Sequence, residues 1–311
     1  MAQTPVPVSP AQLQDQAVSP VTPSIEMDTS TVRLTKAPAD RWHDVVDPVW
    51  ARVRAEAEDV VGREPVMAAF LTGAVLGQPS LEAAIGQRIA SRLDHPDVPA
   101  PVLQAAYLEA TSDDKSISQA LRADVMAVVD RDPAATRALD PVLYFKGFHA
   151  IQTHRLAHWL WQRGQLDLAL YLQSRASSVY GVDIHPQVPM GRGIFFDHAT
   201  GVVIGMTAVI EDDVSILQGV TLGGTGKETG DRHPKIRRGV LIGAGAKVLG
   251  NIEVGRCARV AAGSVVLKPV PRNTTVAGIP AKVVGEVGCV EPSRSMDQMF
   301  EDSFIFAGAD I

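Results

Sequence analysis

The sequence predicts an α+β protein in which a helical region precedes a parallel β-helix built from six-residue repeats. Two observations carry this prediction. Apolar residues recur at every sixth position in two runs, whereas the residues before these runs follow the three- and four-residue spacing of helices. The six-residue positions are Ile184, Met190, Phe196, Val202, Ala208, Val214 and Val220, then Ile236, Ile242, Val248, Val254, Val260 and Val266.

A period of six fits neither an amphipathic helix nor an alternating strand. It is typical of hexapeptide coils, in which each repeat supplies a short strand and a turn, and three repeats close one coil of about eighteen residues. Val220 and Ile236 are sixteen residues apart, so ten additional residues, 226–235, are expected to interrupt the coil as a loop. We expect the coil over 182–287 and chemistry at this loop, because insertions in solenoids often lie on the binding face.

The region 40–178 is expected to be a helical domain that caps the coil and offers an oligomerisation surface. Trp50, Val53, Ala57 and Val60 have helical spacing, and Ser80 is a suitable N-cap for a helix over Leu81–Leu93. Gly164 is well placed to end a helix. Further helices are expected over 100–110, 116–129, 141–163 and 165–178.

Composition limits the remaining possibilities. Residues 1–38 are rich in Pro, Ser, Thr, Ala and Gln and are expected to be disordered, and 288–311 are expected to form a flexible tail. A net charge of −6 gives no indication of nucleic acid or an anionic membrane, and neither a membrane span nor a signal peptide is expected. Cys257 and Cys289 form no CxxC pair, which favours a reducing cytoplasmic location.

Three local patterns are weak signals. The Gly-Gly-Thr-Gly-Lys run at 223–227 lacks the spacing of a phosphate-binding loop, and Gly243-Ala244-Gly245 lacks the third glycine of a dinucleotide fingerprint. His154 and His158 have a metal-binding spacing on an expected helix, but no third ligand is evident. We expect packed or solvated histidines there rather than a metal site.

The stronger constellation surrounds the coil. With eighteen residues to a coil, Asp183 stacks near Gly201, which brings a contact with His198 within reach. A histidine oriented by a carboxylate is a general base for an alcohol, and an arginine such as Arg232, on the inserted loop, is a natural clamp for a carboxylate. The alternative is that Asp183 caps a turn and His198 fills a corner.

Several motifs resemble those of the serine O-acetyltransferases, a family of hexapeptide-repeat acyltransferases. The resemblance covers about residues 45–311 and leaves the first forty outside it. The motifs are Asp130-Arg-Asp-Pro, Tyr144-Phe-Lys-Gly-Phe-His-Ala, Asp183-Ile-His-Pro, Gly191-Arg-Gly-Ile, Asp197-His-Ala-Thr-Gly, Val214-Ser-Ile-Leu-Gln, Thr221-Leu-Gly-Gly-Thr-Gly-Lys, Gly230-Asp-Arg-His-Pro-Lys-Ile, Ile242-Gly-Ala-Gly-Ala-Lys and Leu249-Gly-Asn-Ile-Glu-Val-Gly.

The resemblance implies a left-handed coil and the transfer of an acetyl group from acetyl-CoA to the hydroxyl of L-serine, giving O-acetyl-L-serine for cysteine synthesis. It implies no metal. It makes His198 the general base and Asp183 the group that orients its ring. The residues implied to bind substrate and cofactor are Arg232 and His233 for the serine carboxylate, Asp132 and Asp197 for its ammonium group, backbone N–H groups of Gly223 and Gly224 for the oxyanion, and Ala244, Ala262 and Lys282 for CoA.

The resemblance also implies partners. It predicts a homo-oligomer, either a trimer or a pair of trimers, with CoA between neighbouring subunits, and L-cysteine as a feedback inhibitor. A C-terminal isoleucine, here Ile311, is implied to enter the active site of O-acetylserine sulfhydrylase. Ala309 departs from the family pattern, in which a second glycine is common near this position.

Three other functions stay open from the residues alone. An acetyltransferase acting on a sugar or a xenobiotic shares the coil and a catalytic histidine, but it needs no paired grip on an amino acid. A coil carbonic anhydrase needs three histidine ligands, for which His185, His198 and His233 are the available candidates. A non-catalytic scaffold with a partner-binding tail needs none of these side chains.

Overall fold

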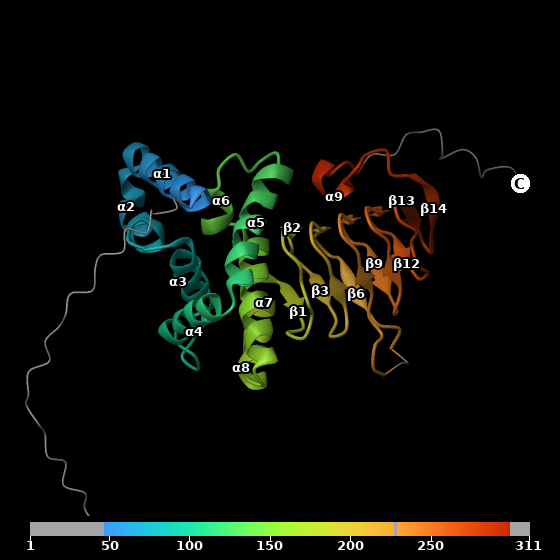
Figure 1. Ribbon diagram of the computed structural model, residues 1–311, viewed down its shortest axis with the longest axis horizontal. Coiled ribbons are helices and arrows are strands. Elements are labelled where there is room, and N and C mark those ends of the chain that lie inside the picture. The colour runs from blue at the N-terminus through green and yellow to red at the C-terminus, as the bar shows by residue number, and fades with distance from the viewer. Residues whose placement is uncertain (1–46, 227–228, 299–311) are drawn as a thin grey trace, which may run out of the picture. The chain divides into compact units, whose positions relative to one another are not determined.

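The computed structural model describes residues 47–226 and 229–298. The described residues belong to one compact unit. In this unit a helical region is followed by a region of short parallel strands, as the sequence predicted (Figure 1). In the part of the chain that is described, no helix has the length and apolar character needed to cross a membrane.

Short-range signals set several helix ends. The Asp47 carboxylate accepts hydrogen bonds from the N–H groups of Val49 and Trp50, and the Ser80 hydroxyl accepts one from Ala83, which confirms Ser80 as an N-cap. Gly164 has φ +75, as expected of a glycine that follows a helix. The helical elements are α1 (Pro48–Arg63), η1 (Pro65–Met67), α2 (Ala68–Leu71), η2 (Thr72–Leu76), α3 (Leu81–Leu93), α4 (Ala100–Asp113), α5 (Lys115–Arg131), α6 (Leu139–Leu143), α7 (Lys146–Gln162), α8 (Leu166–Tyr180) and α9 (Pro292–Ser295).

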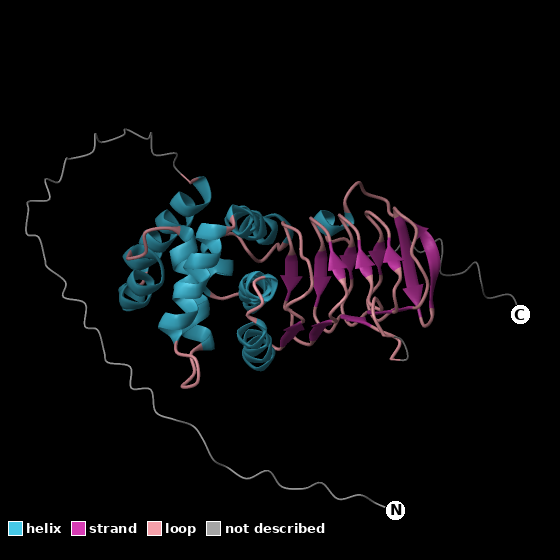
Figure 2. Ribbon diagram, turned by 60° about the horizontal axis from the view of Figure 1, so that its bottom comes forward, coloured by secondary structure: helices cyan, strands magenta, loops and turns pink. Residues whose placement is uncertain are grey.

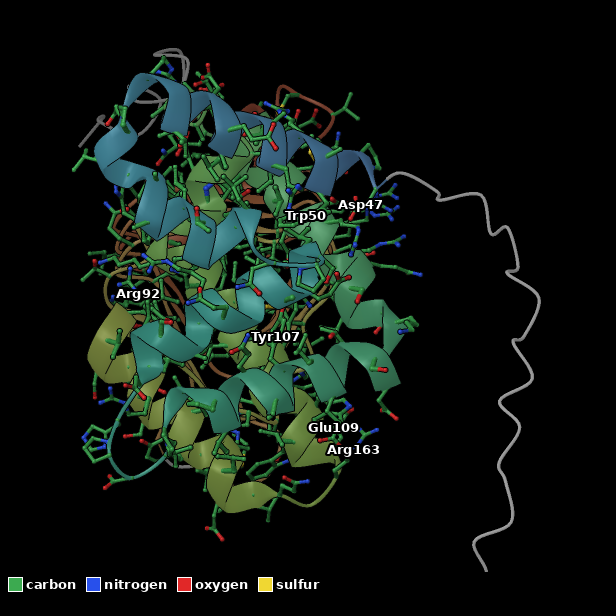
Figure 3. All side chains as sticks on the ribbon, turned by 90° about the vertical axis from the view of Figure 1, so that its left-hand side faces the viewer. Asp47, Trp50, Arg92, Tyr107, Glu109 and Arg163 are labelled. Carbon is green, nitrogen blue, oxygen red and sulfur yellow. The ribbon has the colours of Figure 1, made fainter. Side chains whose placement is uncertain are left out.

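One expected helix is wrong. The segment 141–163 divides into α6 and α7, because Phe145 adopts an extended conformation with φ −82 and ψ 108. Elsewhere the helical region has a continuous apolar interior that includes the fully buried Tyr107, seen among the helices in Figure 3. A Cβ on Gly86 would lie 3.1 Å from the Tyr107 ring, so α3 and α4 approach closely at this glycine.

Fourteen short strands follow in the described residues, and thirteen of them pair in parallel in successive coils around an apolar interior (Figure 2). Three sheets make the sides of the coil. The first contains β1 (Val182–Ile184), β3 (Val202–Ile204), β6 (Thr221–Gly223), β9 (Lys247–Leu249) and β12 (Val265–Val266). The second contains β4 (Val209–Ile210), β7 (Lys235–Ile236) and β10 (Glu253–Val254). The third contains β2 (Phe195–Asp197), β5 (Ser215–Leu217), β8 (Leu241–Ile242), β11 (Arg259–Val260), β13 (Thr274–Gly278) and the antiparallel β14 (Ala281–Glu286).

The register corrects the coil lengths expected from sequence. Val203 pairs with Thr221, eighteen residues on, as expected, but Asp183 pairs with Val203, twenty residues on. Asp183 therefore does not stack near Gly201. The two additional residues belong to the corner between β2 and β3, where His198 and Ala199 have φ 53 and 62.

The register also changes the size of the interruption in the coil. Thr221 pairs with Lys247, twenty-six residues on, so this coil has eight residues more than an eighteen-residue coil, not ten. The difference of two arises because Leu222, rather than Val220, is the inward residue in register with Val248. Lys235, expected in the loop, belongs to β7. Both Val220 and Leu222 are fully buried, so the six-residue pattern alone could not distinguish them.

Part of the expected tail is packed against the coil. Ser293 is fully buried, its N–H lies 3.4 Å from the Gly239 carbonyl oxygen, and its carbonyl accepts a 2.7 Å hydrogen bond from the Ser215 hydroxyl. Ile311 and the disordered extension expected over 1–38 lie outside the described residues. The other domain boundaries remain predictions.

Two buried histidines of α7 make the free energy of unfolding depend on pH. The stability of the protein in acid therefore tests the packing of the helical core. His149 and His154 each place Nε2 2.9 Å from a carbonyl oxygen, of Val142 and Val188, and each has a buried Nδ1 without a partner. Burial lowers the pKa of both to about 3. Since this lies below the ordinary value of about 6.5, the neutral rings favour the folded state above pH 6.5, and this stability is lost as the pH falls toward 3.

We therefore expect the free energy of unfolding to fall below pH 6.5 by about 1.4 kcal/mol per pH unit for each histidine. Urea unfolding at several values between pH 7 and pH 5 measures this slope. The His154→Gln variant keeps a donor for the Val188 carbonyl and loses one titrating ring, so its slope should be shallower by about 1.4 kcal/mol per pH unit. Equal slopes in the two proteins would show that His154 does not titrate in this way.

Candidate active site

His198 lies on an exposed corner of the coil. Its side chain is 79% exposed, and its backbone, like that of Ala199, adopts the left-handed conformation that side-chain-bearing residues rarely take. A strained backbone that presents an exposed imidazole is a common feature of functional sites. The nearest carboxylate is that of Asp197, whose Oδ1 is 3.8 Å from His198 Nε2.

Two carboxylates lie beside this corner. Asp132, at the C-terminal end of α5, accepts a 2.8 Å hydrogen bond from the Ala134 N–H, and its negative charge acts on Asp197. Burial raises the pKa of Asp197, and the Asp132 charge raises it further, against the opposing effect of His198. Two carboxylates that repel one another gain from a bound cation, so the pair is suited to an ammonium group.

The N-terminal turn of α7 holds the corner from behind. A Cβ on Gly147 would lie 2.3 Å from the Phe196 carbonyl oxygen and 3.1 Å from the Ala199 Cβ, so only glycine permits this approach. The ammonium group of Lys146 contacts the Thr200 hydroxyl from the same turn. The motif at 144–150 therefore packs the His198 corner against the helical region.

Arg232 and His233 lie on the next corner of the coil, between the first and second sheets. The Thr207 hydroxyl oxygen accepts hydrogen bonds from the backbone N–H groups of Arg232 and His233, at 3.0 and 3.1 Å. Lys235 Nζ donates to the Thr207 carbonyl at 2.6 Å, to the His233 carbonyl at 2.9 Å and to Asp231 at 2.5 Å. These contacts fix the end of the interrupting segment on the coil.

The tautomer of His233 follows from its neighbours. The Thr207 N–H donates to His233 Nδ1 at 3.2 Å, so Nδ1 is the unprotonated nitrogen and Nε2 carries the proton. Burial and the charges of Arg232 and Lys235 lower the pKa of His233, which keeps the ring neutral at pH 7. A Cβ on Gly205 would lie 2.1 Å from Nε2, so this glycine makes room for the ring. His233 is thus a fixed, neutral N–H donor beside the Arg232 guanidinium.

Asp183 does not occupy its expected place. Its Oδ1 accepts a 2.6 Å hydrogen bond from Gln173 of α8, and among the described residues neither a hydrogen bond nor an ion pair joins it to His198. The twenty-residue first coil aligns Asp183 with Val203 instead of Gly201.

The residues expected to bind CoA lie at three places on the coil. Ala244 and Ala262 lie on the corner row that contains His198, where backbone hydrogen bonds of 2.7–2.8 Å link Thr200 to Gly219, Gln218 to Gly245 and Ala244 to Gly263. Gly223 ends β6, and a Cβ on Gly224 would lie 3.0 Å from an Arg232 guanidinium nitrogen, so both glycines belong to the Arg232 corner. Lys282 is exposed on β14.

The candidate residues therefore form two clusters on one chain. The base cluster comprises His198, Asp197 and Asp132, and the carboxylate cluster comprises Arg232, His233 and Thr207. Sequence reasoning missed Thr207, Gly205, Lys235 and Gln173, because a single threonine, glycine, lysine or glutamine between repeats carries no signal of its own.

The metal alternatives lose support from this placement. In the described residues, no three histidine, cysteine, aspartate or glutamate side chains gather closely enough to hold a metal ion. His185 lies after β1, on the same row of corners as Arg232, and packs edge-on against Trp161, whereas His198 is on a different row. His154 and His158 hydrogen-bond the Val188 and Pro186 carbonyls, which confirms that they are packed helix histidines.

A coil of this kind, with an exposed histidine beside a row of small corner residues, defines a hexapeptide-repeat acyltransferase. Two family models match the chain. "Serine acetyltransferase, N-terminal" matches residues 49–153, and "Bacterial transferase hexapeptide (six repeats)" matches residues 233–268.

Individual serine acetyltransferases are also similar to this chain over most of its length. The serine acetyltransferase of Salmonella typhimurium is 52% identical over 252 residues, which are 81% of this chain and 92% of the relative. The structure of Brucella abortus serine acetyltransferase in complex with coenzyme A is 62% identical with a TM-score of 0.77, over 78% of this chain and 98% of that one. A serine acetyltransferase structure in complex with cysteine is 50% identical with a TM-score of 0.80, over 81% of this chain and 98% of that one.

The chain belongs to the serine acetyltransferase family. It is an acyltransferase that uses acetyl-CoA as co-substrate and L-serine as acceptor, as the sequence predicted.

Proposed function

We propose that the base cluster and the carboxylate cluster act on the same serine molecule. Asp132 and Asp197 receive its ammonium group, Arg232 and His233 receive its carboxylate, and His198 takes the proton from its hydroxyl. The observation that carries this proposal is the complementary chemistry of the clusters. One presents two carboxylates beside an exposed imidazole, and the other presents a guanidinium beside a fixed neutral N–H donor.

We propose further that two copies of the chain complete each site. The clusters lie on different corners of one chain, separated by the strand Val202–Ile204. Three residues of extended chain span roughly 10 Å, whereas the carboxylate, ammonium and hydroxyl groups of serine lie within about 4 Å of one another. Apposition of the base cluster of one copy with the carboxylate cluster of its neighbour removes this mismatch and accounts for the predicted trimer or pair of trimers.

The reaction then needs only proton transfer and positioning. His198 removes the hydroxyl proton as the serine oxygen attacks the thioester carbonyl of acetyl-CoA, forming a C–O bond and a tetrahedral oxyanion. Backbone N–H groups at Gly223 and Gly224 stabilise this oxyanion. The C–S bond then breaks, and the protonated His198 returns its proton to the leaving CoA sulfur.

The role of Asp183 in this scheme depends on its hydrogen-bond partner. It orients His198 only if it exchanges its Gln173 partner for the imidazole when substrates bind. Asp197, already 3.8 Å from His198 Nε2, is the carboxylate that stabilises the imidazolium without such an exchange. CoA lies along the corner row of Ala244 and Ala262, with Lys282 near a phosphate group.

Other parts of the proposal rest on the family. L-cysteine carries the ammonium and carboxylate groups of serine with a thiol in place of the hydroxyl, so it fits both clusters and inhibits by competing with serine. The coil is left-handed, and the unpaired Cys257 and Cys289 are in keeping with a cytoplasmic location.

The tail is proposed to bind O-acetylserine sulfhydrylase through Ile311, because a free carboxylate beside an apolar side chain resembles an amino acid. Deleting Ile311 should abolish this binding and leave acetyl transfer nearly unchanged. Equal affinities of the truncated and full-length proteins for the sulfhydrylase would exclude the idea.

Separation of oligomers tests the shared site. Thiol release from acetyl-CoA, measured with and without L-serine, should give serine-dependent activity in trimer or hexamer fractions and none in monomer fractions. A monomer with full serine-dependent turnover would contradict a site shared between copies.

A further inference from the structure

Arg131, the last residue of α5, is a buried charge that the proposed mechanism does not use. Its side chain is 2% exposed, Nη1 donates to the Ser215 hydroxyl at 3.1 Å, and Nη2 lies 3.4 Å from Asp213 Oδ1. The buried Nε has no hydrogen-bond partner. Burying a guanidinium with this incomplete set of partners costs free energy. This cost points to a role for Arg131 in positioning the residues around it.

Ser215 connects Arg131 to the segment 291–297. The Ser215 hydroxyl accepts from Arg131 and donates to the Ser293 carbonyl at 2.7 Å, so its proton and a lone pair are both committed. Arg259 Nη1 donates to the Asp297 carbonyl at 2.8 Å, and Arg294 lies 4.0 Å from Asp130. This segment was expected to be flexible, yet hydrogen bonds and an ion pair hold it at several points beside the end of α5.

The same contacts lie beside the ammonium-binding carboxylates. Asp132 directly follows Arg131 and ends α5. Ser215 begins β5, which pairs with β2 so that Phe195 aligns with Ser215 and Asp197 with Leu217. A cavity of about 470 Å³ is lined by Asp132 together with Arg131, Arg294 and Ser295. Arg131 thus joins the end of α5, which carries Asp132, to the sheet that carries Asp197.

We infer that Arg131, Ser215 and the segment 291–297 form a positioning device that holds Asp132 at the right place for the ammonium group of serine. The inference rests on the proposed role of Asp132. Neither Arg131 nor Ser215 touches substrate in this account. Their loss lets the end of α5 shift, and the shift weakens the grip on the amino group while the CoA row stays as it was.

The Ser215→Ala variant of the full-length protein tests the device. We expect the KM for L-serine to rise roughly 5- to 30-fold, less than the roughly 10- to 150-fold for losing a hydrogen bond to a charged group outright, because Ser215 acts on the ammonium group only through Asp132. The KM for acetyl-CoA should change less than twofold. Ser118→Ala at the opposite end of α5 removes a 3.5 Å hydrogen bond to the Thr111 carbonyl and is the matched control, with kinetics expected to equal those of the original protein. Arg131→Lys serves as a second variant if Ser215→Ala is poorly folded.

An acceptor without an amino group separates positioning from general damage. 3-Hydroxypropionate lacks the ammonium group, so its kcat/KM should be nearly the same in Ser215→Ala as in the original protein. In an Asp132→Asn background, Ser215→Ala should add nothing to the serine KM, because the group it positions has already lost its charge.

The outcomes are distinguishable. Equal losses for serine and 3-hydroxypropionate, or additive effects of Ser215→Ala and Asp132→Asn on the serine KM, would overturn the inference. An Asp132→Asn enzyme with an unchanged serine KM would instead show that the proposed ammonium site is wrong. A selective, non-additive rise in the serine KM would establish the device.

Discussion

Replacing His198 with alanine is expected to lower turnover by roughly 10²–10⁴ at saturating serine and acetyl-CoA, the usual contribution of a general base. The side chain is exposed, and the polar side chain beside it is Asp197 at 3.8 Å, so its removal leaves no buried group without a partner. We therefore expect the melting temperature and the affinity for CoA to stay close to those of the original protein. Steady-state thiol release, calorimetric titration with CoA and thermal unfolding measure these quantities.

The control for this variant is His95→Ala. His95 is also an exposed histidine beside an aspartate, with Nδ1 3.1 Å from Asp97 Oδ2, but it lies between α3 and α4. Its turnover should be unchanged. A His198→Ala enzyme with near-original turnover at saturating serine would contradict the assignment of the base.

Replacing Arg232 with alanine is expected to raise the KM for serine by roughly 10- to 150-fold, the range for a lost hydrogen bond between charged groups. The effect should fall on serine because His233, held beside Arg232 by Thr207, keeps only a neutral donor for the carboxylate. The affinity for acetyl-CoA should change little. Arg232→Lys should restore part of the affinity, since lysine keeps the charge but loses the two-pronged geometry of the guanidinium.

Arg237→Ala is the matched control for Arg232. Arg237 lies on a following corner of the same coil and pairs with Glu211 at 2.8 Å and Glu253 at 2.5 Å, away from both clusters. Its serine KM should be unaffected. Loss of acetyl-CoA affinity in Arg232→Ala with serine affinity retained would mean that the two ligands have been assigned to the wrong corners.

Much of this architecture is readable from the sequence because it repeats. Apolar residues at every sixth position required stacked coils, and Ser80 and Gly164 marked helix ends through local backbone chemistry. The family motifs then predicted the base and the residues that bind both ends of the substrate. Such signals are either periodic or contiguous, so a single sequence reveals them.

The register of the coils and the hydrogen bonds that support the site could not be predicted in this way. The twenty-residue first coil depends on the left-handed backbone at His198 and Ala199, and both Val202 and Ile204 are buried, so neither hydrophobicity nor spacing distinguished the two alignments. The contact of Asp183 with Gln173 and that of Ser215 with Ser293 join residues whose types are common everywhere. Long-range hydrogen bonds of this kind leave no local pattern in the chain.

The measurement that tests the shared site most directly is complementation between two variants that are impaired in different clusters. His198→Ala and Arg232→Ala are expressed together in equal amounts, so that they assemble at random, and the purified mixture is assayed at a serine concentration that is limiting for Arg232→Ala. Each site formed by neighbouring copies then receives an intact His198 from one and an intact Arg232 from the other in about one quarter of cases. We predict about one quarter of the original activity, and no recovery when the separately purified variants are mixed without subunit exchange. Activity in the co-expressed mixture no higher than the average of the two variants alone would contradict the account.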